Sequence, residues 1–274
     1  MRVLCINDIS CVGKCSLTVS LPIISACGVT CDVLPTAVLS THTGGFTGYT
    51  LRDLTSDIPD IIKHWKSLDL KFDFIYSGYL SDQKQIDLVY LISKDFLKEG
   101  GKFIVDPVMG DNGKLYAGFN DNFVQQMRSL CSFADFILPN VTEACLLAGV
   151  PYEEFMQNKD GFALVKALSK ICPRPIVTGV QREEAIGVHY IDGEGVAACY
   201  TTQNVDGFFH GSGDVFSSAF VGALAKGKAV DTAIMLAADF TTAAIKRTAK
   251  EVEDKRFGLN FEAEIIPFLK ALKD

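Results

Sequence analysis

A glycine-flanked serine followed directly by an aspartate, Gly211-Ser212-Gly213-Asp214, carries the strongest chemical signal in the sequence. The next ten residues, 215–224, are almost all small or apolar and predict a buried helix. Glycines before such a helix let its free backbone N–H groups converge on one point, with the positive end of the helix dipole behind them. This arrangement binds an anion, typically a phosphate group. An aspartate at a helix start can also be a simple cap, so the rest of the chain must decide between the two interpretations.

A second acidic stretch, residues 106–116, offers candidate ligands for a metal ion. Asp106 ends an apolar segment, and Pro107 favours an extended conformation for it, so its carboxylate can point out of a strand end. Turn residues at 110–113 place Asp111 nearby. A few carboxylate oxygens are typical of Mg²⁺ that is held mostly by water and nucleotide phosphates. The alternative is that both aspartates only stabilise local turns.

Apolar strand segments alternate with helical segments along the chain, and this order predicts an α/β fold with a mainly parallel central sheet and helices on both faces. The strands are expected at residues 2–6, 29–39, 72–76, 102–105, 135–138 and 175–178, with a hairpin over 186–200. The helices are expected at residues 16–27, 58–68, 83–98, 119–130, 142–148 and 160–170, followed by three more from 214, 230 and 261. We expect a single domain over residues 1–274.

Ligands of open α/β sheets bind outside the carboxyl ends of the strands. Polar residues follow the predicted strands repeatedly, and the coincidence predicts one cleft at that edge of the sheet. These residues are Asn7, Asp8, His42, Thr43, Ser77, Tyr79, Asp106, Asn140, Glu143 and Thr178.

The composition argues against several classes of partner and targeting segment. A net charge of −7 argues against nucleic acid or an anionic membrane as the main partner, and no apolar run is long enough to span a bilayer. Polar and charged residues interrupt the first eight positions, so no secretory signal is expected. The nine cysteines form no CxxC pair and are typical of reduced thiols in a cytoplasmic protein.

Three common catalytic or nucleotide-binding motifs are absent. The segment 11–16 fails the P-loop pattern because Asp8 stands where its first glycine belongs, and Cys15 replaces the Ser or Thr after the lysine. No GxGxxG follows the first strand, which argues against a dinucleotide dehydrogenase. No GxSxG elbow supports a hydrolase triad.

Five motifs, in the same order along the chain, resemble those of the pyridoxal/pyridoxamine kinase family of the ribokinase-like superfamily. Gly211 to Asp214 matches the GxGD signature, and residues 106–116 match the DPVMGDNG segment of the vitamin kinases. Residues 139–143 match PNxxE, residues 77–80 match SGYL, and residues 40–44 match an SNHTG-like loop. The similarity covers nearly the whole chain and implies a ribokinase-like, three-layer α/β/α kinase domain.

The resemblance also implies an activity: ATP-dependent phosphorylation of the 5'-hydroxymethyl group of a B6 vitamer, with Mg²⁺ as metal. Asp214 would then remove the proton from the alcohol. Backbone N–H groups of residues 211–213 (Gly211, Ser212 and Gly213) would stabilise charge on the transferred phosphoryl group. The resemblance assigns Mg²⁺, held directly or through water, to Asp106, Asp111 and Glu143.

The remaining site residues come from the same resemblance. Asn140 and Thr178 are expected beside the ATP phosphates, and a homodimer is expected because family members commonly form one. The residues expected around the substrate ring are Asp8, Ser10, Thr43, Tyr79 and His210.

Two positions depart from the best-known pyridoxal kinases and keep an alternative open. Asp8 stands where those enzymes usually carry a serine, and residues 7–10 resemble the Ser-Asp-x-Ser of hydroxymethylpyrimidine kinases. His210 stands where many relatives have an apolar residue. The alternatives are therefore a hydroxymethylpyrimidine kinase of thiamine synthesis and, in a different class, a non-catalytic nucleotide or vitamin sensor. The intact Asp214 and acidic positions argue against the sensor.

Overall fold

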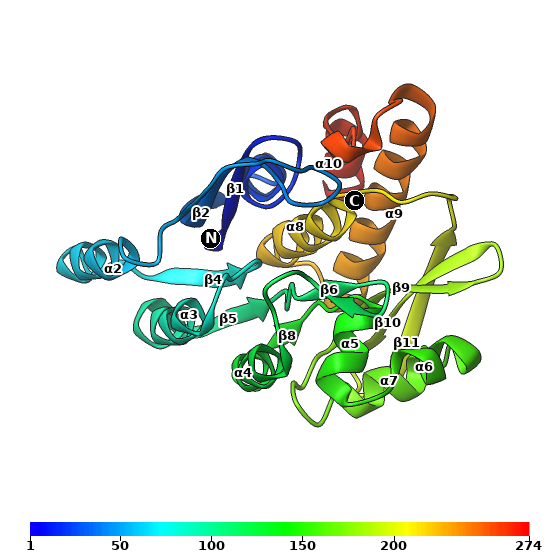
Figure 1. Cartoon of the computed structure of the whole chain (residues 1–274), viewed down its shortest axis with the longest axis horizontal. Coiled ribbons are helices and arrows are strands. Elements are labelled where there is room, and N and C mark those ends of the chain that lie inside the picture. The colour runs from blue at the N-terminus through cyan, green and yellow to red at the C-terminus, as the bar shows by residue number, and fades with distance from the viewer. Residues whose placement is uncertain (274) are drawn as a thin grey trace.

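A six-stranded sheet with helices on both faces forms the centre of the protein, in a computed structural model that describes residues 1–273 (Figure 1). The strand order is β3-β2-β1-β4-β5-β8, and only the β2–β3 pair is antiparallel among the pairs of this sheet. The strands are β1 (Arg2–Val12), β2 (Thr30–Thr41), β3 (Leu51–Asp53), β4 (Phe72–Ser77), β5 (Leu97–Val105) and β8 (Phe136–Ile137). The predicted mainly parallel sheet is confirmed.

Each face of the sheet has its own hydrophobic core, because alternate residues of a strand point to opposite faces. On β1, Val3 and Cys5 belong to one core, and Leu4 and Ile6 belong to the other. The first core contains α1 (Leu17–Ala26), α8 (Ser212–Ala225), α9 (Val230–Glu251) and α10 (Ile265–Lys273). The second contains α2 (Ile58–Ser67), α3 (Gln83–Phe96), α4 (Asp121–Cys131), α5 (Val141–Ala148), α6 (Tyr152–Asn158) and α7 (Gly161–Leu168). This is the predicted three-layer α/β/α arrangement.

Two small sheets complete the fold. The antiparallel sheet β11-β10-β9 contains the predicted hairpin, and the pair β6–β7 lies in the acidic stretch after β5. Two parallel bridges, Ile137 to Pro175 and Asn140 to Thr178, join the start of the β11-β10-β9 sheet to the end of the main sheet. The strands are β6 (Gly110–Asp111), β7 (Lys114–Leu115), β9 (Ile176–Arg182), β10 (Ala185–Ile191) and β11 (Ala197–Gln203).

The first two strands are longer than predicted. β1 does not stop at Ile6 but continues to Val12, and β2 runs through Pro35 without a break. The reason lies in their pairing: Pro35 faces Asn7 at the point where the register shifts. A regular ladder would not tolerate the missing N–H of proline, but here it falls at an irregularity. Pairing then resumes, with Ile9 opposite Val38. Asp8 and Ser10, expected in a loop, therefore belong to a strand.

Three smaller differences have local causes. β5 begins at Leu97 and includes the two glycines expected to separate it from α3. The short helix α6 and the edge strand β3 were not predicted, because segments of seven and three residues carry too little periodicity to be recognised.

Within residues 1–273, no helix is long and apolar enough to cross a membrane.

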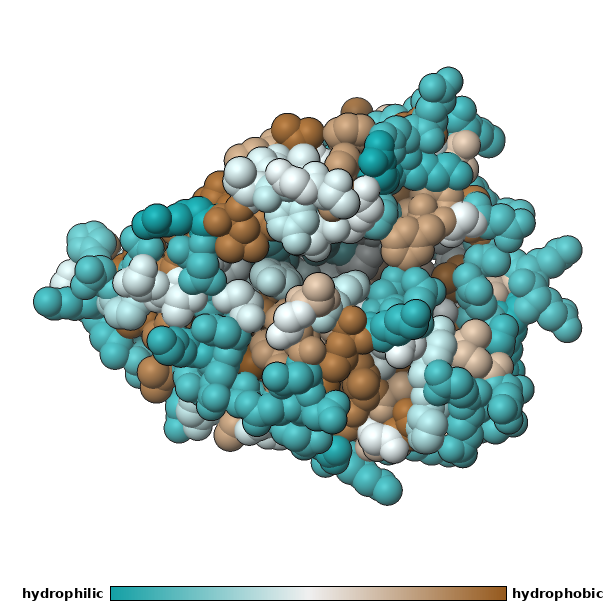
Figure 2. Space-filling view, viewed as in Figure 1, coloured by the Kyte–Doolittle hydropathy of each residue, from teal (hydrophilic) through white to brown (hydrophobic). Residues whose placement is uncertain are grey.

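The arrows of β4 and β5 point toward the region where β6 and the start of α8 lie (Figure 1). A recess lies near the middle of this face, below a lobe of nearly neutral residues (Figure 2). The carboxyl ends of the strands and the amino end of α8 therefore meet in one region. This is where an open α/β sheet binds its ligands.

Candidate active site

The start of α8 has the geometry expected of an anion cradle. Gly211 caps the helix with φ 76° and ψ 5°, a left-handed conformation that favours glycine. A Cβ at this position would lie 2.4 Å from the carbonyl oxygen of Lys14, so the close approach also requires glycine. Ser212 begins the helix, Gly213 is exposed, and the amides of the first turn have no acceptor within the helix. They are free to bind an anion.

Asp214 lies in the first turn of α8, next to these amides. Burial raises its pKa to about 7; a backbone hydrogen bond from Ser16 opposes this shift, and the nearby charge of Asp8 adds to it. A carboxylate that titrates near neutral pH is suited to accept a proton from an alcohol. The side chain thus lies at the cradle and close to the first strand, not turned away into the core.

Asp106 joins the strand ends to α8. It is buried just after β5, and the hydroxyl of Ser217 donates a hydrogen bond to its Oδ2 at 2.9 Å. Burial, followed by the charge of Asp214, raises the pKa of Asp106 to about 7. Ser217 was missed by the sequence analysis, although its position three residues after Asp214 puts both on one face of a helix. Asp106 and Asp214 were correctly expected to lie together.

Glu143 and Asn140 form a capping box at the start of α5. The side chain of Asn140 accepts a hydrogen bond from the amide of Glu143 at 3.0 Å, and Oε2 of Glu143 accepts one from the amide of Asn140 at 2.9 Å. Oε1 of Glu143 also accepts from the amide of Met109 at 3.1 Å, and Nδ2 of Asn140 donates to the carbonyl of Gly110 at 2.9 Å. Both side chains hold the acidic loop against α5.

The three residues predicted to hold Mg²⁺ do not form a single ligand set. Asp111 accepts a hydrogen bond from the amide of Asn112 in its own turn, and the two oxygens of Glu143 are bound to backbone amides. Among residues 1–273, no group of three His, Cys, Asp or Glu side chains is arranged to hold a metal. Local backbone donors already bind two of these carboxylates, and their role in holding Mg²⁺, directly or through water, stays a prediction.

The carboxylates nevertheless form an unneutralised acidic region. Burial, followed by the charge of Asp106, raises the pKa of Glu143 well above its ordinary range, and burial raises that of Asp111. In the described part of the chain, no salt bridge involves Asp8, Asp106, Glu143 or Asp214. Carboxylates without a basic partner are a suitable environment for a cation that is bound mostly through water.

Thr178 lies beside this region at the other side of Asn140. Its backbone forms a parallel bridge to Asn140, and its amide donates to the carbonyl of Pro139 at 3.0 Å. The structure therefore brings Thr178 and Asn140 together as the sequence suggested. Their contact with ATP phosphates stays a prediction.

Asp8 approaches Asp214 from the first strand. Its side chain is buried, and Oδ1 accepts a hydrogen bond from the hydroxyl of Ser16 at 2.5 Å. Burial raises the pKa of Asp8, while the Ser16 hydroxyl lowers it. Ser10 is fully buried, and within residues 1–273 its hydroxyl has no hydrogen-bond partner. The carboxylate of Asp8 and the hydroxyl of Ser10 are therefore polar groups near the cradle with bonding capacity to spare.

Asn7 and Tyr79 connect the first strand to the loop after β4. Oδ1 of Asn7 accepts hydrogen bonds from the amides of Asp8 at 3.0 Å and Tyr79 at 2.8 Å. Its Nδ2 is buried and has no partner among the described residues. Burial, followed by the charge of Asp8, raises the pKa of Tyr79 to about 12. The Tyr79 side chain thus lies near Asp8, as expected for residues around one substrate.

The loop after β2 places His42 in the interior, and contact of Thr43 with a substrate ring stays a prediction. Thr43 is exposed, whereas His42 is buried and lies 5.2 Å from His210 between ring centroids. The amide of Gly44 donates to Nδ1 of His42, so Nε2 carries the proton and donates to the carbonyl of Arg256 at 2.6 Å. Burial, followed by the charge of His42, lowers the pKa of His210. The two imidazoles form one wall on the same side as Asp8.

Comparison with known proteins shows the family of the chain. The sequence profile of the phosphomethylpyrimidine kinase family matches residues 21–259, most of the chain. The pyridoxine kinase of Bacillus subtilis is 33% identical over 172 residues, which cover 60% of this chain but only 61% of that enzyme's length.

Two solved structures match over nearly their full length. The pyridoxal kinase of Lactobacillus plantarum is 31% identical with a TM-score of 0.90, covering 98% of this chain and 96% of that chain. A Bacteroides thetaiotaomicron protein, described as a phosphomethylpyrimidine kinase and crystallised with pyridoxal, is 34% identical with a TM-score of 0.91. The match covers 97% of this chain and 95% of that chain. The chain therefore belongs to the phosphomethylpyrimidine kinase family, in the pyridoxal kinase group of the ribokinase-like superfamily.

Proposed function

We propose that this protein is an ATP-dependent kinase that phosphorylates the 5'-hydroxymethyl group of a B6 vitamer: pyridoxal, pyridoxine or pyridoxamine. The observation that carries the proposal is the position of Asp214 beside the free amides of α8 and close to Asp106. Phosphoryl transfer demands little covalent chemistry from a protein; it needs aligned reactants, donors for the developing charge and a base. The similarity to B6 kinases supports the choice of acceptor.

In the proposed reaction, Asp214 takes the proton of the substrate hydroxyl as its oxygen forms a bond to the γ-phosphorus of ATP. The bond from that phosphorus to the β–γ bridging oxygen breaks, and ADP leaves with the electron pair. Amides of Gly211, Ser212 and Gly213 donate hydrogen bonds to the phosphoryl oxygens, where negative charge accumulates. The base and the donors lie within one helical turn, which fixes the direction of attack.

Asp106, Asp111 and Glu143 would hold a divalent cation in this acidic region, directly or through water. When bound, Mg²⁺ supplies positive charge that screens the phosphates of ATP from these carboxylates. Ser217 keeps Oδ2 of Asp106 occupied, so the other oxygen remains available. Asn140 and Thr178 are proposed to lie beside the phosphates at the same edge.

A second acceptor is favoured by a specific observation. Asp8 is a buried carboxyl in the first strand where B6 kinases commonly have serine, and the family profile that matches this chain is that of phosphomethylpyrimidine kinases. A hydroxymethylpyrimidine presents ring nitrogens and an amino group, which a carboxyl can bind. Phosphorylation of hydroxymethylpyrimidine is therefore the alternative function of the same site.

The test of the function is an ATP-consumption assay with four alcohols: pyridoxal, pyridoxine, pyridoxamine and hydroxymethylpyrimidine, with ribose as control. We expect the highest kcat/KM for a B6 vitamer. A preference for hydroxymethylpyrimidine would select the alternative. ATP and vitamer binding without turnover of any alcohol would instead indicate a non-catalytic sensor.

Changing Asp8 to Ser should shift the relative rates with these four alcohols. A serine hydroxyl is neutral, so we expect kcat/KM for hydroxymethylpyrimidine to fall by about 10-fold relative to pyridoxal, the scale of one hydrogen bond to a charged group. The measurement is the ratio of kcat/KM values in the wild-type and variant proteins. Unchanged ratios would mean that Asp8 does not contact the ring.

Three further parts complete the proposal. The whole chain, residues 1–274, is proposed to act as one kinase domain. Thr43, Tyr79, Ser10 and His210 are proposed to surround the substrate ring. The protein is proposed to work in the cytoplasm as a homodimer, which sedimentation of the purified protein can test.

A further inference from the structure

A segment between α9 and α10 contacts three segments on the proposed acceptor side of the site: the loop after β2, the residues before α8 and the segment after β1. We call this segment, residues 253–262, the C-terminal strap. The carbonyl of Arg256 accepts from His42 at 2.6 Å, and the rings of Phe257 and Phe46 lie 5.2 Å apart. The ammonium of Lys255 lies 4.9 Å from the ring centroid of Phe209, just before the cradle. None of these contacts was anticipated from the sequence.

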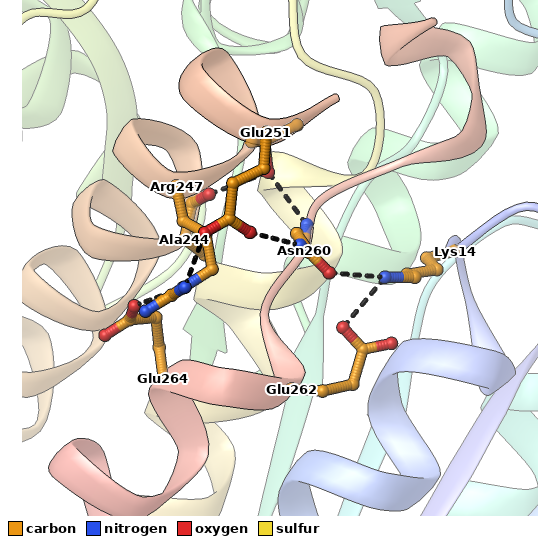
Figure 3. Close-up of polar contacts among 8 residues, drawn as sticks. Lys14, Ala244, Arg247, Glu251, Asn260, Glu262 and Glu264 are labelled. Atoms are coloured by element: carbon orange, nitrogen blue, oxygen red, sulfur yellow. Dashed lines mark hydrogen bonds and ion pairs between the residues drawn. The ribbon is translucent and has the colours of Figure 1, made fainter. Parts of the chain in front are cut away.

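The third contact, with the segment after β1, centres on Lys14. Its amide donates to the carbonyl of Phe257 at 3.0 Å. Its ammonium group binds Oε2 of Glu262 at 2.8 Å and Oδ1 of Asn260 at 3.3 Å (Figure 3). Backbone and side chain of Lys14 are thus both held by the strap.

The carbonyl oxygen of Lys14 is enclosed by two glycines. A Cβ on Gly211 would come within 2.4 Å of it, and a Cβ on Gly258 within 2.6 Å. Gly211 begins the anion cradle, and Gly258 belongs to the strap with φ 89°. The peptide of Lys14 therefore lies between Gly258 of the strap and Gly211 of the cradle.

The residues after Lys14 extend this connection to the reacting groups. Cys15 Sγ lies 3.5 Å from the position of a Cβ on Gly211. Ser16 donates its hydroxyl to Asp8, and its backbone hydrogen bond acts on Asp214. One short segment thus contacts the cradle, the proposed base and the proposed ring-binding carboxyl.

The strap itself is anchored to α9. The amide of Asn260 donates to the hydroxyl of Thr248 at 2.8 Å, and its Nδ2 donates to Glu251 at 2.8 Å. Arg247 binds both Glu251 and Glu264, each at 2.7 Å, so that Asn260 lies between a fixed helix end and Lys14 (Figure 3). The anchor makes the strap a rigid support for the loops that it contacts.

We propose that Lys14 is a positioning residue: the strap fixes it through Glu262 and Phe257, and it fixes Gly211 and Ser16 in the geometry that phosphoryl transfer needs. The ammonium group of Lys14 is bound to Asn260 and Glu262 of the strap. The proposal rests on the proposed kinase function for its effect on rate, but the structural coupling stands independently of the identity of the substrate.

Three variants test the coupling. Lys14→Met should lower kcat by about 5-fold with little change in either KM, because a small displacement of the cradle affects the transition state more than ground-state binding. Lys14→Arg should retain activity. Gly258→Ala, which pushes a methyl group toward the Lys14 carbonyl, should lower kcat by about 10- to 100-fold. The change in melting temperature of Lys14→Met should be small, because partly exposed ion pairs contribute little to stability.

A readout without substrates separates positioning from general weakening. Hydrogen exchange of the peptide containing residues 211–214 should be faster by about 3-fold or more in Lys14→Met, as expected for local opening. The matched control is Lys98→Met, which removes a similar pair with Asp73 at the opposite end of the strands. Wild-type exchange and wild-type kcat in both the Lys14→Met and Gly258→Ala proteins would overturn the proposal. If exchange changes but no alcohol is phosphorylated by the wild type, the kinase function fails and the coupling stands.

Discussion

The Asp214→Asn protein should bind ATP and pyridoxal with nearly wild-type affinity and lose about 10²–10⁴-fold in kcat, the usual contribution of a general base. Asparagine keeps the size of the side chain and its place in the first turn of α8, but it cannot accept the proton. Binding would be measured by calorimetry, and kcat by ADP formation. Near wild-type turnover would remove the assignment of Asp214 as the base.

Asp231 provides the matched control, because it lies in the first turn of the neighbouring helix α9. If Asp214 were only a partner of the helix dipole, both substitutions would cost a similar, small amount of stability, about 0.3–1 kcal/mol, and neither would change kcat. We expect Asp231→Asn to leave kcat unchanged. The difference between the two variants therefore measures chemistry rather than helix capping.

The same residue determines the pH dependence of rate and stability. Because the pKa of Asp214 is about 7, kcat/KM should rise tenfold per pH unit below 7 and level off above it. Folding raises this pKa, so the protonated carboxyl stabilises the folded state fully below about pH 4, and this contribution is lost as the pH rises through 7. At pH 8, Asp214→Asn should therefore be more stable than wild type, on the order of 2 kcal/mol, but not at pH 4. Urea denaturation of both proteins at pH 4 and pH 8 tests this. The same difference in free energy of unfolding at the two pH values would contradict it.

Removal of divalent cations should abolish activity, by about 10³-fold or more, since charge stabilisation by metal ions dominates phosphoryl transfer. The structural reason is the acidic region of Asp106, Glu143 and Asp214, which has no basic partner in any salt bridge of residues 1–273. A triphosphate brought next to these carboxylates would be repelled unless a cation lay between them. The measurement is the rate in excess chelator, followed by addition of Mg²⁺.

Two additional results define the metal role. The Asp106→Asn protein should need a higher Mg²⁺ concentration for half-maximal rate. For the wild-type protein, calorimetry should show weaker binding of ATP in chelator than in the presence of Mg²⁺. The Asp73→Asn protein, altered at the opposite end of the strands, should behave as wild type. Full activity in excess chelator would refute the requirement for a divalent cation.

Apart from the short elements β3, β6, β7 and α6, the sequence predicted the order of strands and helices, because apolar periodicity is a local property. It also predicted that Asp106 and Asp214 meet, because strand-end chemistry is local as well. It did not predict that Glu143 and Asn140 would form a capping box, although the Asn-x-x-Glu spacing carries that signal. Nor did it predict the contact of Arg256 with His42, since two residues separated by 214 positions share no sequence pattern. Sequence motifs identified the chemical groups, whereas the supports that hold them depend on long-range packing.

The irregularity between β1 and β2 allows a strand that contains a proline to reach the site. Asn7 pairs with Pro35, but Ile9 pairs with Val38, so β2 contains one more residue than β1 in this interval. Asn7 and Ile9 lie on one face of β1, and paired residues of a parallel ladder point the same way, so Pro35 and Val38 also share a face although they are three positions apart. The extra residue is absorbed in the interior, because Thr36 and Ala37 are both fully buried. The irregularity therefore accommodates Pro35, which has no N–H to donate, without changing the face on which any later residue of β2 lies, and the strand still leads to His42 on the side of His210.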